Sequence, residues 1–362
     1  MTTAGETVAP NIRDLADLER QMTGWLQARL DRASELRLDN FAYPKGAGMS
    51  HETILFDAHW QEDGQARSRG LVVRIKPTTH LVYPDDMFEQ QYRIMAVLAR
   101  SGKVRVAEPL WLEHDPSLLG APFFVMEKRH GKVAVSIPPY MREGWLVDTA
   151  PDARRAIWHN AVTELARIQT VPLEDVAFLD PPGGPQGFAY EWDRWTRILG
   201  WISQGRRFEF LERAYATLEA TMPADRSPGI VWGDARIGNM MIGEDRQVAA
   251  VMDWEQPSLG GPLHDLGWWF HHEYGQTVGA GIPRLEGFGT REETLALWSE
   301  VCGKSTADIH WHEAFAAFKM SCLNVRTSEL GAAISRGRDV VDNASTRRLA
   351  ELLDIAPPAK AA

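Results

Sequence analysis

The chain of 362 residues carries a formal net charge of −10 and is 44% hydrophobic. This length exceeds one ordinary hydrophobic core and suits two domains, and the composition excludes a largely disordered protein. Acidic residues number 49 and basic residues 39, so we expect no nucleic-acid partner, because a polyanion is repelled by such an average field.

Neither a signal peptide nor a membrane partner is expected. The first residues lack a basic segment followed by an apolar run, and no apolar run reaches the roughly 18 residues of a membrane span. The two cysteines, Cys302 and Cys322, form neither a disulfide framework nor a metal-binding motif. These features predict a cytoplasmic protein and leave its oligomeric state open.

The first part of the chain predicts a small antiparallel sheet with one long helix inserted. Asp85 or Asp86 is the expected N-cap of that helix, and Gly102 is its expected end. The expected elements, in chain order, are a helix over 12–32, strands over 53–60 and 71–77, a helix over 85–101, and strands over 104–115 and 121–131.

The rest of the chain predicts mainly helix, interrupted by one compact strand–loop–strand segment over 229–257. The whole pattern predicts an α+β protein with two lobes, a β-rich lobe over 1–127 and a helical lobe over 128–362. A cleft between two lobes is a common place for ligands. The expected helices cover 152–169, 189–222 with a break near Gly200 and Gly205, 263–275, 291–302 and 309–335.

The most informative segment reads VWGDARIGNMM and continues to VAAVMDWE. Asp234 and Asn239 have the spacing of the base and the asparagine in a protein-kinase catalytic loop, and Asp253 follows fourteen residues later. A turn at residues 243–245 between two β-prone runs predicts a hairpin that brings Asn239 beside Asp253.

Phosphoryl transfer needs this set of groups. Mg²⁺ prefers oxygen ligands and needs few from the protein, so Asn239 and Asp253 fit as metal ligands. Asp234 fits the carboxylate that orients the acceptor hydroxyl and takes its proton late. A lone D-x-x-x-x-N pattern is usually a turn, but three elements in this order beside apolar strands favour the catalytic interpretation. The sequence has no G-x-S-x-G hydrolase motif and no complete dinucleotide fingerprint.

At these residues the sequence resembles the aminoglycoside phosphotransferase family, also called choline-kinase-like, over about residues 40–335. The resemblance implies a protein-kinase-like fold and transfer of the γ-phosphoryl group of ATP or GTP to a small hydroxylated molecule with Mg²⁺. It is greatest for bacterial members similar to the kinase domain fused to some acyl-CoA dehydrogenases. The family usually has His two residues before the catalytic Asp, where this chain has Trp232, which can pack beneath the loop but lacks imidazole hydrogen bonds.

The resemblance also implies a nucleotide site in the first lobe. Gly48 and Ser50, with Thr53, correspond to the family's G-x-S-x-x-T segment, where backbone N–H groups can approach phosphates. On the following strand, Arg74 and Lys76 point to the same face, and the family register favours Arg74 for the α/β-phosphates.

The segment PFFVMEKRHG matches the family's linker, so Met126 and Lys128 would offer backbone groups to the adenine edge. An ordinary buried strand ending in a glycine turn is the alternative. The helical carboxylate that usually pairs with the strand cation aligns with Gln91. Either Glu89 replaces that carboxylate, or the cation is held by a neutral hydrogen bond.

Several further residues lie near the motif. Arg236 could stabilise the transferring phosphoryl charge, or it could pair structurally with a carboxylate. Asp265 resembles a family Asp that anchors the loop, so its expected role is structural. The run with Trp268, Trp269, His272 and Tyr274 could face the substrate, although such aromatic residues more often build core. Adjacent His271 and His272 fail the spacing of a zinc site.

Two functions remain open at this point. The first is an active small-molecule kinase, which the three catalytic groups favour. The second is a non-catalytic nucleotide-binding relative, a pseudokinase, which Trp232 and Gln91 would suit. For the acceptor, the family name implies aminoglycosides, whereas the tryptophan content and the dehydrogenase-linked resemblance favour a less polar alcohol such as a hydroxyacyl compound.

Overall fold

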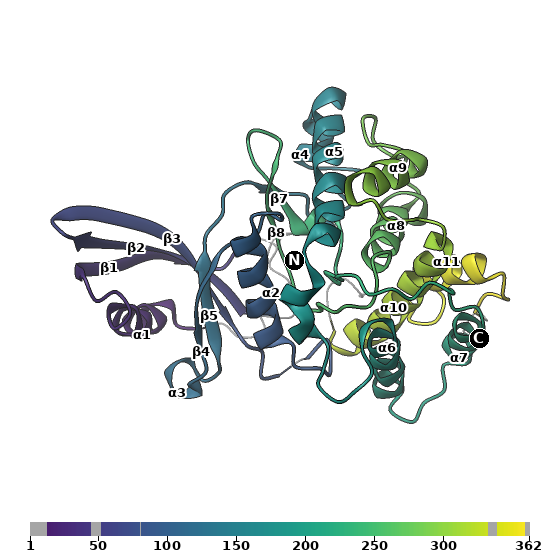
Figure 1. Ribbon diagram of the computed structural model, residues 1–362, viewed down its shortest axis with the longest axis horizontal. Coiled ribbons are helices and arrows are strands. Elements are labelled where there is room, and N and C mark those ends of the chain that lie inside the picture. The colour runs from purple at the N-terminus through teal and green to yellow at the C-terminus, as the bar shows by residue number, and fades with distance from the viewer. Residues whose placement is uncertain (1–12, 45–51, 80, 332–338, 359–362) are drawn as a thin grey trace. The chain divides into compact units, whose positions relative to one another are not determined.

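The computed structural model describes residues 13–44, 52–79, 81–331 and 339–358. The chain forms two compact units (Figure 1). The first comprises residues 1–82 and 107–130, and the second comprises residues 83–106 and 131–362. The sequence places the lobe boundary at residue 127, and this boundary stays a prediction.

The first unit is built on a five-stranded antiparallel sheet with the strand order β1-β2-β3-β5-β4. The two long central strands form the expected hairpin, with Thr53 opposite Arg74 in its register. The strands are β1 (Ala33–Ala42), β2 (Glu52–Glu62), β3 (Gln65–Ile75), β4 (Pro109–Glu113) and β5 (Phe123–Glu127).

Strand β1 is absent from the sequence prediction, and its composition explains why. It contains acidic and amide residues that are depleted in strands, and it lacks valine, isoleucine and threonine. Glu35 and Asn40 have positive φ values of 55° and 57°, and the register with β2 shifts at both places. The strand is therefore held by its pairing with β2 rather than by local preference.

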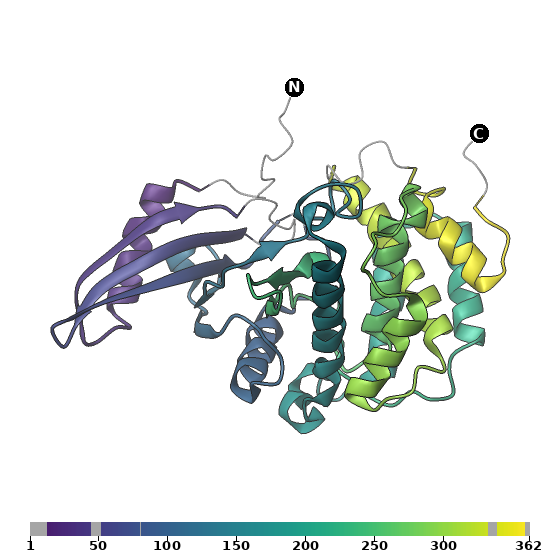
Figure 2. The same ribbon diagram turned by 90° about the horizontal axis from the view of Figure 1, so that it is seen from above.

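Helix α1 (Leu15–Gln27) packs on this sheet and closes its apolar core (Figure 2). Trp25 lies edge-on to Trp111 with ring centroids 6.0 Å apart, and it also contacts Phe123 at 5.0 Å. Along β2, buried and half-buried side chains alternate because successive residues of a strand point to opposite faces. The core side therefore carries Ile54 and Phe56.

Helix α2 (Phe88–Ser101) belongs to the second unit by its contacts. Gly102 ends the helix in the left-handed conformation, with φ 65°, as expected. The N-cap prediction is wrong, because Met87 occupies the cap position and Asp85 instead pairs with Arg194 and Arg197. Asp86 still accepts the N–H of Phe88 at 3.2 Å.

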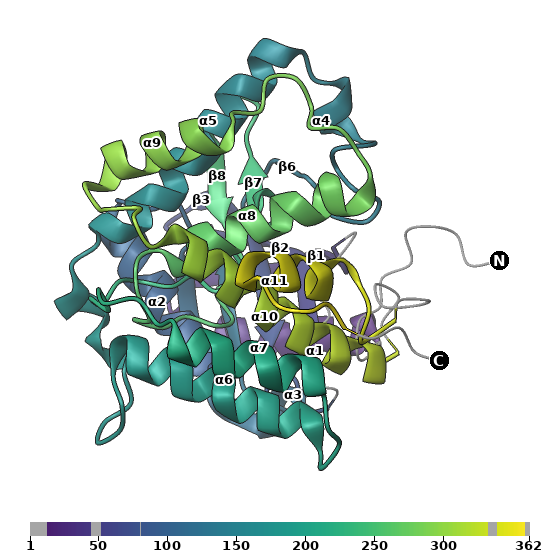
Figure 3. The same cartoon turned by 90° about the vertical axis from the view of Figure 1, so that its right-hand side faces the viewer.

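The second unit is mainly helical and is organised around the long helix α10, which packs against α8, α11, α7 and α6 (Figure 3). The buried rings of α10 include Trp311, Phe315 and Phe318. No helix in the described part of the chain combines the length and the apolar character of a membrane span. The longer helices are α5 (Pro151–Arg167), α6 (Gly187–Ser203), α7 (Glu209–Ala220), α8 (His264–Gln276), α9 (Arg291–Cys302), α10 (Ile309–Glu329) and α11 (Ala344–Leu353).

A three-stranded antiparallel sheet in the second unit carries the motif found in the sequence. Its order is β6-β7-β8, with β6 at Lys132–Val133, β7 at Met240–Ile242 and β8 at Val248–Val251. The break in the helical stretch after residue 189 lies at residues 204–208, so Gly200 is inside α6. The predicted hairpin in the motif is confirmed.

Candidate active site

The hairpin of β7 and β8 places Asn239 beside the residues that lead to Asp253. Met240 pairs with Val251, and the N–H of Met252 donates to the carbonyl oxygen of Asn239 at 2.9 Å. Asn239 directly precedes β7 and Asp253 follows β8. Because the two strands are antiparallel, both proposed metal ligands lie at the end of the hairpin opposite its turn. Asn239 is buried, with 5% of its surface exposed.

Asp253 adopts an unusual backbone conformation at this end. Its φ of 64° lies in the left-handed region, which costs a non-glycine residue about 1 kcal/mol. Strained residues persist where the surrounding structure holds them, and they gather at functional sites. The conformation is consistent with the predicted role of Asp253 as a metal ligand, because a ligand must hold its carboxylate in one direction.

The Asp234 carboxylate is surrounded by donors from its own loop and from helix α8. Asn239 Nδ2 donates to Oδ2 at 2.6 Å, and Arg236 Nε donates to both oxygens, at 3.1 Å to Oδ2 and 3.3 Å to Oδ1. The indole N–H of Trp268 donates to Oδ1 at 2.9 Å. These contacts hold the carboxylate in one orientation, as a group that aligns an acceptor requires.

The same contacts set the charge of Asp234. Burial alone would raise the pKa of this carboxyl, but the Arg236 guanidinium, the neighbouring His272 and the hydrogen bonds from Trp268 and Asn239 lower it below its ordinary value. Asp234 is therefore an anion at neutral pH. An ionised carboxylate can accept a hydrogen bond from an alcohol and take its proton during transfer.

Arg236 pairs with the carboxylate beside it. Its Nη1 also donates to Ser136 Oγ at 2.9 Å. A Cβ on Gly238 would lie 2.5 Å from the same Nη1, so glycine makes room for the guanidinium. The structure thus shows a structural pairing for Arg236, and its action on a phosphoryl group stays a prediction.

Asp265 fixes the start of the loop that carries Asp234. Its two carboxylate oxygens accept the backbone N–H groups of Trp232 at 2.6 Å and Gly233 at 2.9 Å. Burial raises the pKa of Asp265 to about 6. Gly233 has a φ of 99° and packs against the backbone of Gln256, so a side chain would not fit there. The geometry agrees with the anchoring role expected from the sequence.

Trp232, the departure from the family pattern, is fully buried beneath this loop. Its indole N–H donates to the carbonyl oxygen of Met252 at 2.8 Å, next to Asp253. Its ring lies 5.8 Å from that of Trp254. Trp232 thus links the loop to the hairpin through its own N–H group.

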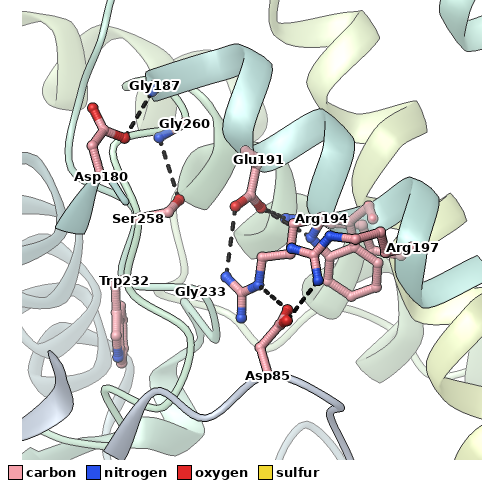
Figure 4. Close-up of polar contacts among 12 residues, drawn as sticks. Asp85, Asp180, Gly187, Glu191, Arg194, Arg197, Trp232, Gly233, Ser258 and Gly260 are labelled. Carbon is pink, nitrogen blue, oxygen red and sulfur yellow. Dashed lines mark hydrogen bonds and ion pairs between the residues drawn. The ribbon is translucent and has the colours of Figure 1, made fainter. Parts of the chain in front are cut away.

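A buried charge network lies in the same unit (Figure 4). Glu191 and Arg194 of α6 form an ion pair at 3.7 Å, and Arg194 also reaches Asp85 at 3.1 Å. Lys319 of α10 lies 3.4 Å from Glu191. Sequence analysis missed this network, and its only signal is charged residues inside otherwise aromatic helical segments.

Lys319 connects this network to the surroundings of Asp234. Its ammonium lies 5.3 Å from the rings of Trp195 and Trp268 and 5.1 Å from that of Phe315. Burial lowers the pKa of Lys319, while Glu191 and Asp265 oppose that shift. Because Trp268 also donates to Asp234, one aromatic side chain contacts both the buried cation and this carboxylate.

Two of the predicted nucleotide-binding residues, Gly48 and Ser50, fall outside the described residues. The other three lie in the first unit. Arg74 is buried in β3, opposite Phe124. The N–H of Lys128 donates to the Gly70 carbonyl at 3.0 Å. This backbone donor is therefore already used inside the unit.

The side chain of Lys128 and the backbone of Met126 also have partners within the first unit. The Lys128 ammonium pairs with Asp57 at 2.9 Å, and this pairing lowers the pKa of the Asp57 carboxyl. Met126 lies in β5, between β3 and β4, where it pairs with Val72 and Pro109. The nucleotide roles of Met126 and Lys128 stay predictions.

Helix α2 carries both candidates for the position of the family's helical carboxylate, Glu89 and Gln91. Glu89 is exposed and lies 3.9 Å from Arg93 of its own helix. Gln91 is fully buried, and its side-chain amide makes no hydrogen bond with any described residue. Within α2, the buried position therefore belongs to the neutral residue and not to Glu89.

The chain belongs to the phosphotransferase enzyme family, which it matches over residues 54–298. Among curated relatives, mouse acyl-CoA dehydrogenase family member 10 is 28% identical over 78% of this chain and 25% of its own length. Chicken acyl-CoA dehydrogenase family member 11 is 25% identical over 86% of this chain and 38% of its own length. The chain thus spans well under half of these relatives.

Solved structures show the same protein-kinase-like α+β fold. A protein from Ralstonia eutropha JMP134, assigned as an aminoglycoside phosphotransferase, has a TM-score of 0.65 and 23% identity, and covers 94% of this chain and 96% of its own. The GDP complex of aminoglycoside 2'-phosphotransferase-IIIa has a TM-score of 0.53 and 14% identity, and covers 93% and 97%. At such identities the likeness establishes the fold.

Proposed function

We propose that this chain is a Mg²⁺-dependent kinase that moves the γ-phosphoryl group of ATP or GTP to a hydroxyl group of a small molecule. The observation that carries the proposal is the gathering of Asp234, Asn239 and Asp253 at the catalytic loop and one end of the hairpin. Family membership supports phosphoryl transfer, and structural neighbours have been solved with GDP and AMP-PNP.

The roles follow from the chemistry of each group. Asn239 and Asp253 would supply an amide and a carboxylate oxygen to Mg²⁺, which neutralises phosphate charge when bound. Asn239 Nδ2 already donates to Asp234, so its amide oxygen is the atom left to face a cation. Asp234 would orient the acceptor hydroxyl and receive its proton. Arg236 would offer a positive charge beside them.

The proposed nucleotide site comprises Gly48, Ser50, Arg74, Met126 and Lys128. The buried cation of Arg74 in β3 supports a phosphate contact. For Lys128, the ion pair with Asp57 favours a contact through its backbone carbonyl rather than its ammonium. These assignments follow the family resemblance.

For the acceptor, we infer a hydroxylated molecule less polar than an aminoglycoside, such as a hydroxyacyl compound. A polycation would meet the Arg236 guanidinium directly beside Asp234. The remaining neighbours of that carboxylate on α8 are Trp268 and His272, an aromatic ring and an imidazole. The alternative is an aminoglycoside, on which several structural neighbours act according to their names.

The test is a transfer assay with γ-labelled ATP or GTP, with and without Mg²⁺, across aminoglycosides, hydroxy acids and hydroxyacyl-CoA thioesters. Asp234→Asn should lower transfer by roughly 10²- to 10⁴-fold while nucleotide binding remains. Asp253→Asn should weaken Mg²⁺–nucleotide binding. Asp245→Asn, in the hairpin turn, is the matched control and should behave as wild type.

A non-catalytic, pseudokinase-like role is the second candidate, and the buried neutral Gln91 in place of a carboxylate favours it. The same assay separates the two. Mg²⁺-dependent nucleotide binding without transfer to any acceptor, and unchanged by Asp234→Asn, would support the second candidate. Absence of nucleotide binding over a broad concentration range would reject both. Turnover of an aminoglycoside alone would reject the less polar acceptor.

A further inference from the structure

His272 lies on the same face of α8 as Trp268, one helical turn further along. Its Nε2 atom is 3.6 Å from Asp234 Oδ1, the oxygen that accepts the Trp268 N–H. The two rings are 5.3 Å apart at an angle of 52°. Helix α8 therefore presents two ring nitrogens to one oxygen of the catalytic carboxylate.

The imidazole of His272 is neutral at physiological pH. Burial lowers its pKa to about 4, with Arg236 adding to the shift and Asp234 opposing it. At 3.6 Å the contact with Asp234 is too long for a hydrogen bond, and a neutral ring cannot form an ion pair. Nε2 has no hydrogen-bond partner among the described residues, although it is buried.

A small cavity adjoins this ring. His272 and Arg236 supply polar groups to its wall, and Tyr140, Trp269 and Phe288 supply aromatic rings. Its volume of about 10 Å³ is close to the space that one water molecule needs. The cavity beside the His272 ring thus has room for a single oxygen atom, but not for a large ligand group.

Three N–H groups donate to the Asp234 carboxylate. Asn239 donates to Oδ2, Trp268 donates to Oδ1, and the Arg236 Nε–H is shared between the two oxygens. A hydroxyl that donates to Oδ1 would therefore replace the longer, 3.3 Å branch of the Arg236 contact. Because Oδ1 and His272 Nε2 are 3.6 Å apart, one oxygen can lie at hydrogen-bonding distance from both.

We propose that His272 is a second contact for the acceptor, and that the oxygen to be phosphorylated bridges Asp234 Oδ1 and His272 Nε2. This rests on the proposed function. The hydroxyl donates its proton to Asp234 and accepts a hydrogen bond from Nε2–H, which leaves one lone pair for phosphorus. As the new O–P bond forms, the bond between the γ-phosphorus and its bridging oxygen breaks, and the hydroxyl proton passes to Asp234.

Fixing the nucleophile by two contacts instead of one removes its rotational freedom before the reaction. His272 then limits which alcohols react, because the carbon next to the hydroxyl must fit beside the aromatic wall. The proposal also applies to water, the smallest acceptor, so acceptor-free hydrolysis of Mg²⁺–ATP is a defined probe.

The experiment compares His272→Phe, which keeps an aromatic ring, with His272→Gln, which keeps a donor. His271→Phe is the matched control, because His271 is the next residue of α8 and contacts Ser345 at 3.2 Å instead of Asp234. Readouts are hydrolysis of Mg²⁺–ATP in water, transfer to the best acceptor of the panel, and the Kd for Mg²⁺–ATP.

We expect His272→Phe to lower kcat for hydrolysis and transfer by roughly tenfold or more, with the Kd for Mg²⁺–ATP within about twofold. His272→Gln should recover part of the loss, and His271→Phe should leave kcat unchanged. Rates for His272→Phe within about twofold of wild type would overturn the proposal. So would equal losses in His272→Phe and His271→Phe.

A protein that binds Mg²⁺–ATP but turns over neither water nor any alcohol refutes the proposed function. The contact is then tested by NMR of the ¹⁵N-labelled His272 imidazole. The AMP-PNP complex is titrated with glycerol, a simple hydroxyl compound, and the chemical shift of the ring nitrogen is followed. A saturable shift that is absent from His271 supports the contact. An unchanged His272 signal overturns it.

Discussion

Trp268 donates its indole N–H to Asp234 Oδ1 at 2.9 Å, across 34 residues of sequence. A neutral donor orients the carboxylate while leaving it charged, whereas a second cation would compete with the acceptor for it. The ring of Trp268 also lies over the Lys319 ammonium. The position of the Asp234 carboxylate therefore depends on how α8 packs against α10.

Trp268→Phe should keep the packing and remove this one hydrogen bond. We expect kcat for phosphoryl transfer to fall by about tenfold, since the carboxylate loses a buried charge-assisted donor. Trp195→Phe is the control, because Trp195 also lies 5.3 Å from Lys319 but donates to Glu191 and not to Asp234. Equal kcat values for the two variants would contradict the assignment.

Lys319→Met should destabilise the second unit. It leaves the Glu191 carboxylate buried without its nearest ammonium, and removing one partner of a buried pair typically costs roughly 3–5 kcal/mol. Urea unfolding measures this change. Adding Glu191→Gln to Lys319→Met should recover part of the loss, because the side chain that lost its ammonium partner is then neutral. A double variant less stable than Lys319→Met would show that the ion pair is not the cause.

Gly267→Ala should disrupt the contact between α8 and α10. A Cβ at this position would lie 2.5 Å from the carbonyl oxygen of His312, and backbone cannot move aside without shifting the helix. Overpacking of this kind costs roughly 1–3 kcal/mol. Gly275→Ala on the same helix meets nothing within 4 Å and should stabilise by up to about 1 kcal/mol. Thermal melting of both variants gives the comparison.

His271 should make the protein less stable in mild acid. Burial lowers its pKa to about 3, so between that value and the ordinary value of 6.5 only the unfolded chain binds this proton. Stability is then lost as pH falls below 6.5, by about 1.4 kcal/mol per pH unit from this residue. His271→Gln should reduce the loss between pH 6.5 and 5.5 by up to that amount. Urea unfolding at both pH values measures the free energy of unfolding. An equal decrease of this free energy in wild type and variant would contradict the prediction.

Several features of the site follow from neighbouring residues alone. Asp234, Asn239 and Asp253 lie in one short stretch where apolar strands and a turn dictate a hairpin, and the strand pairing brings the last two together. Gly102 ends α2 because glycine adopts the left-handed conformation without strain. Sequence reasoning succeeds at such places because the interactions are local.

Other assignments needed the folded chain. Strand β1 has weak local preference and exists through its pairing with β2. Asp85 looked like a helix cap, but the guanidinium groups of α6 hold it instead. An acidic residue before a helix can make either contact, and only the position of a distant partner decides between them.

The sequence by itself identified the phosphotransferase family and predicted roles for Asp234, Asn239 and Asp253, because the motif of a kinase loop carries these residue types at fixed spacing. Only the tertiary structure decided how Asp234 is held, since Trp268 and His272 reach it from another helix and Lys319 lies beneath that helix's aromatic face. Spacing along the chain carries no record of such contacts. They arise when buried helices pack and their polar atoms must find partners within reach.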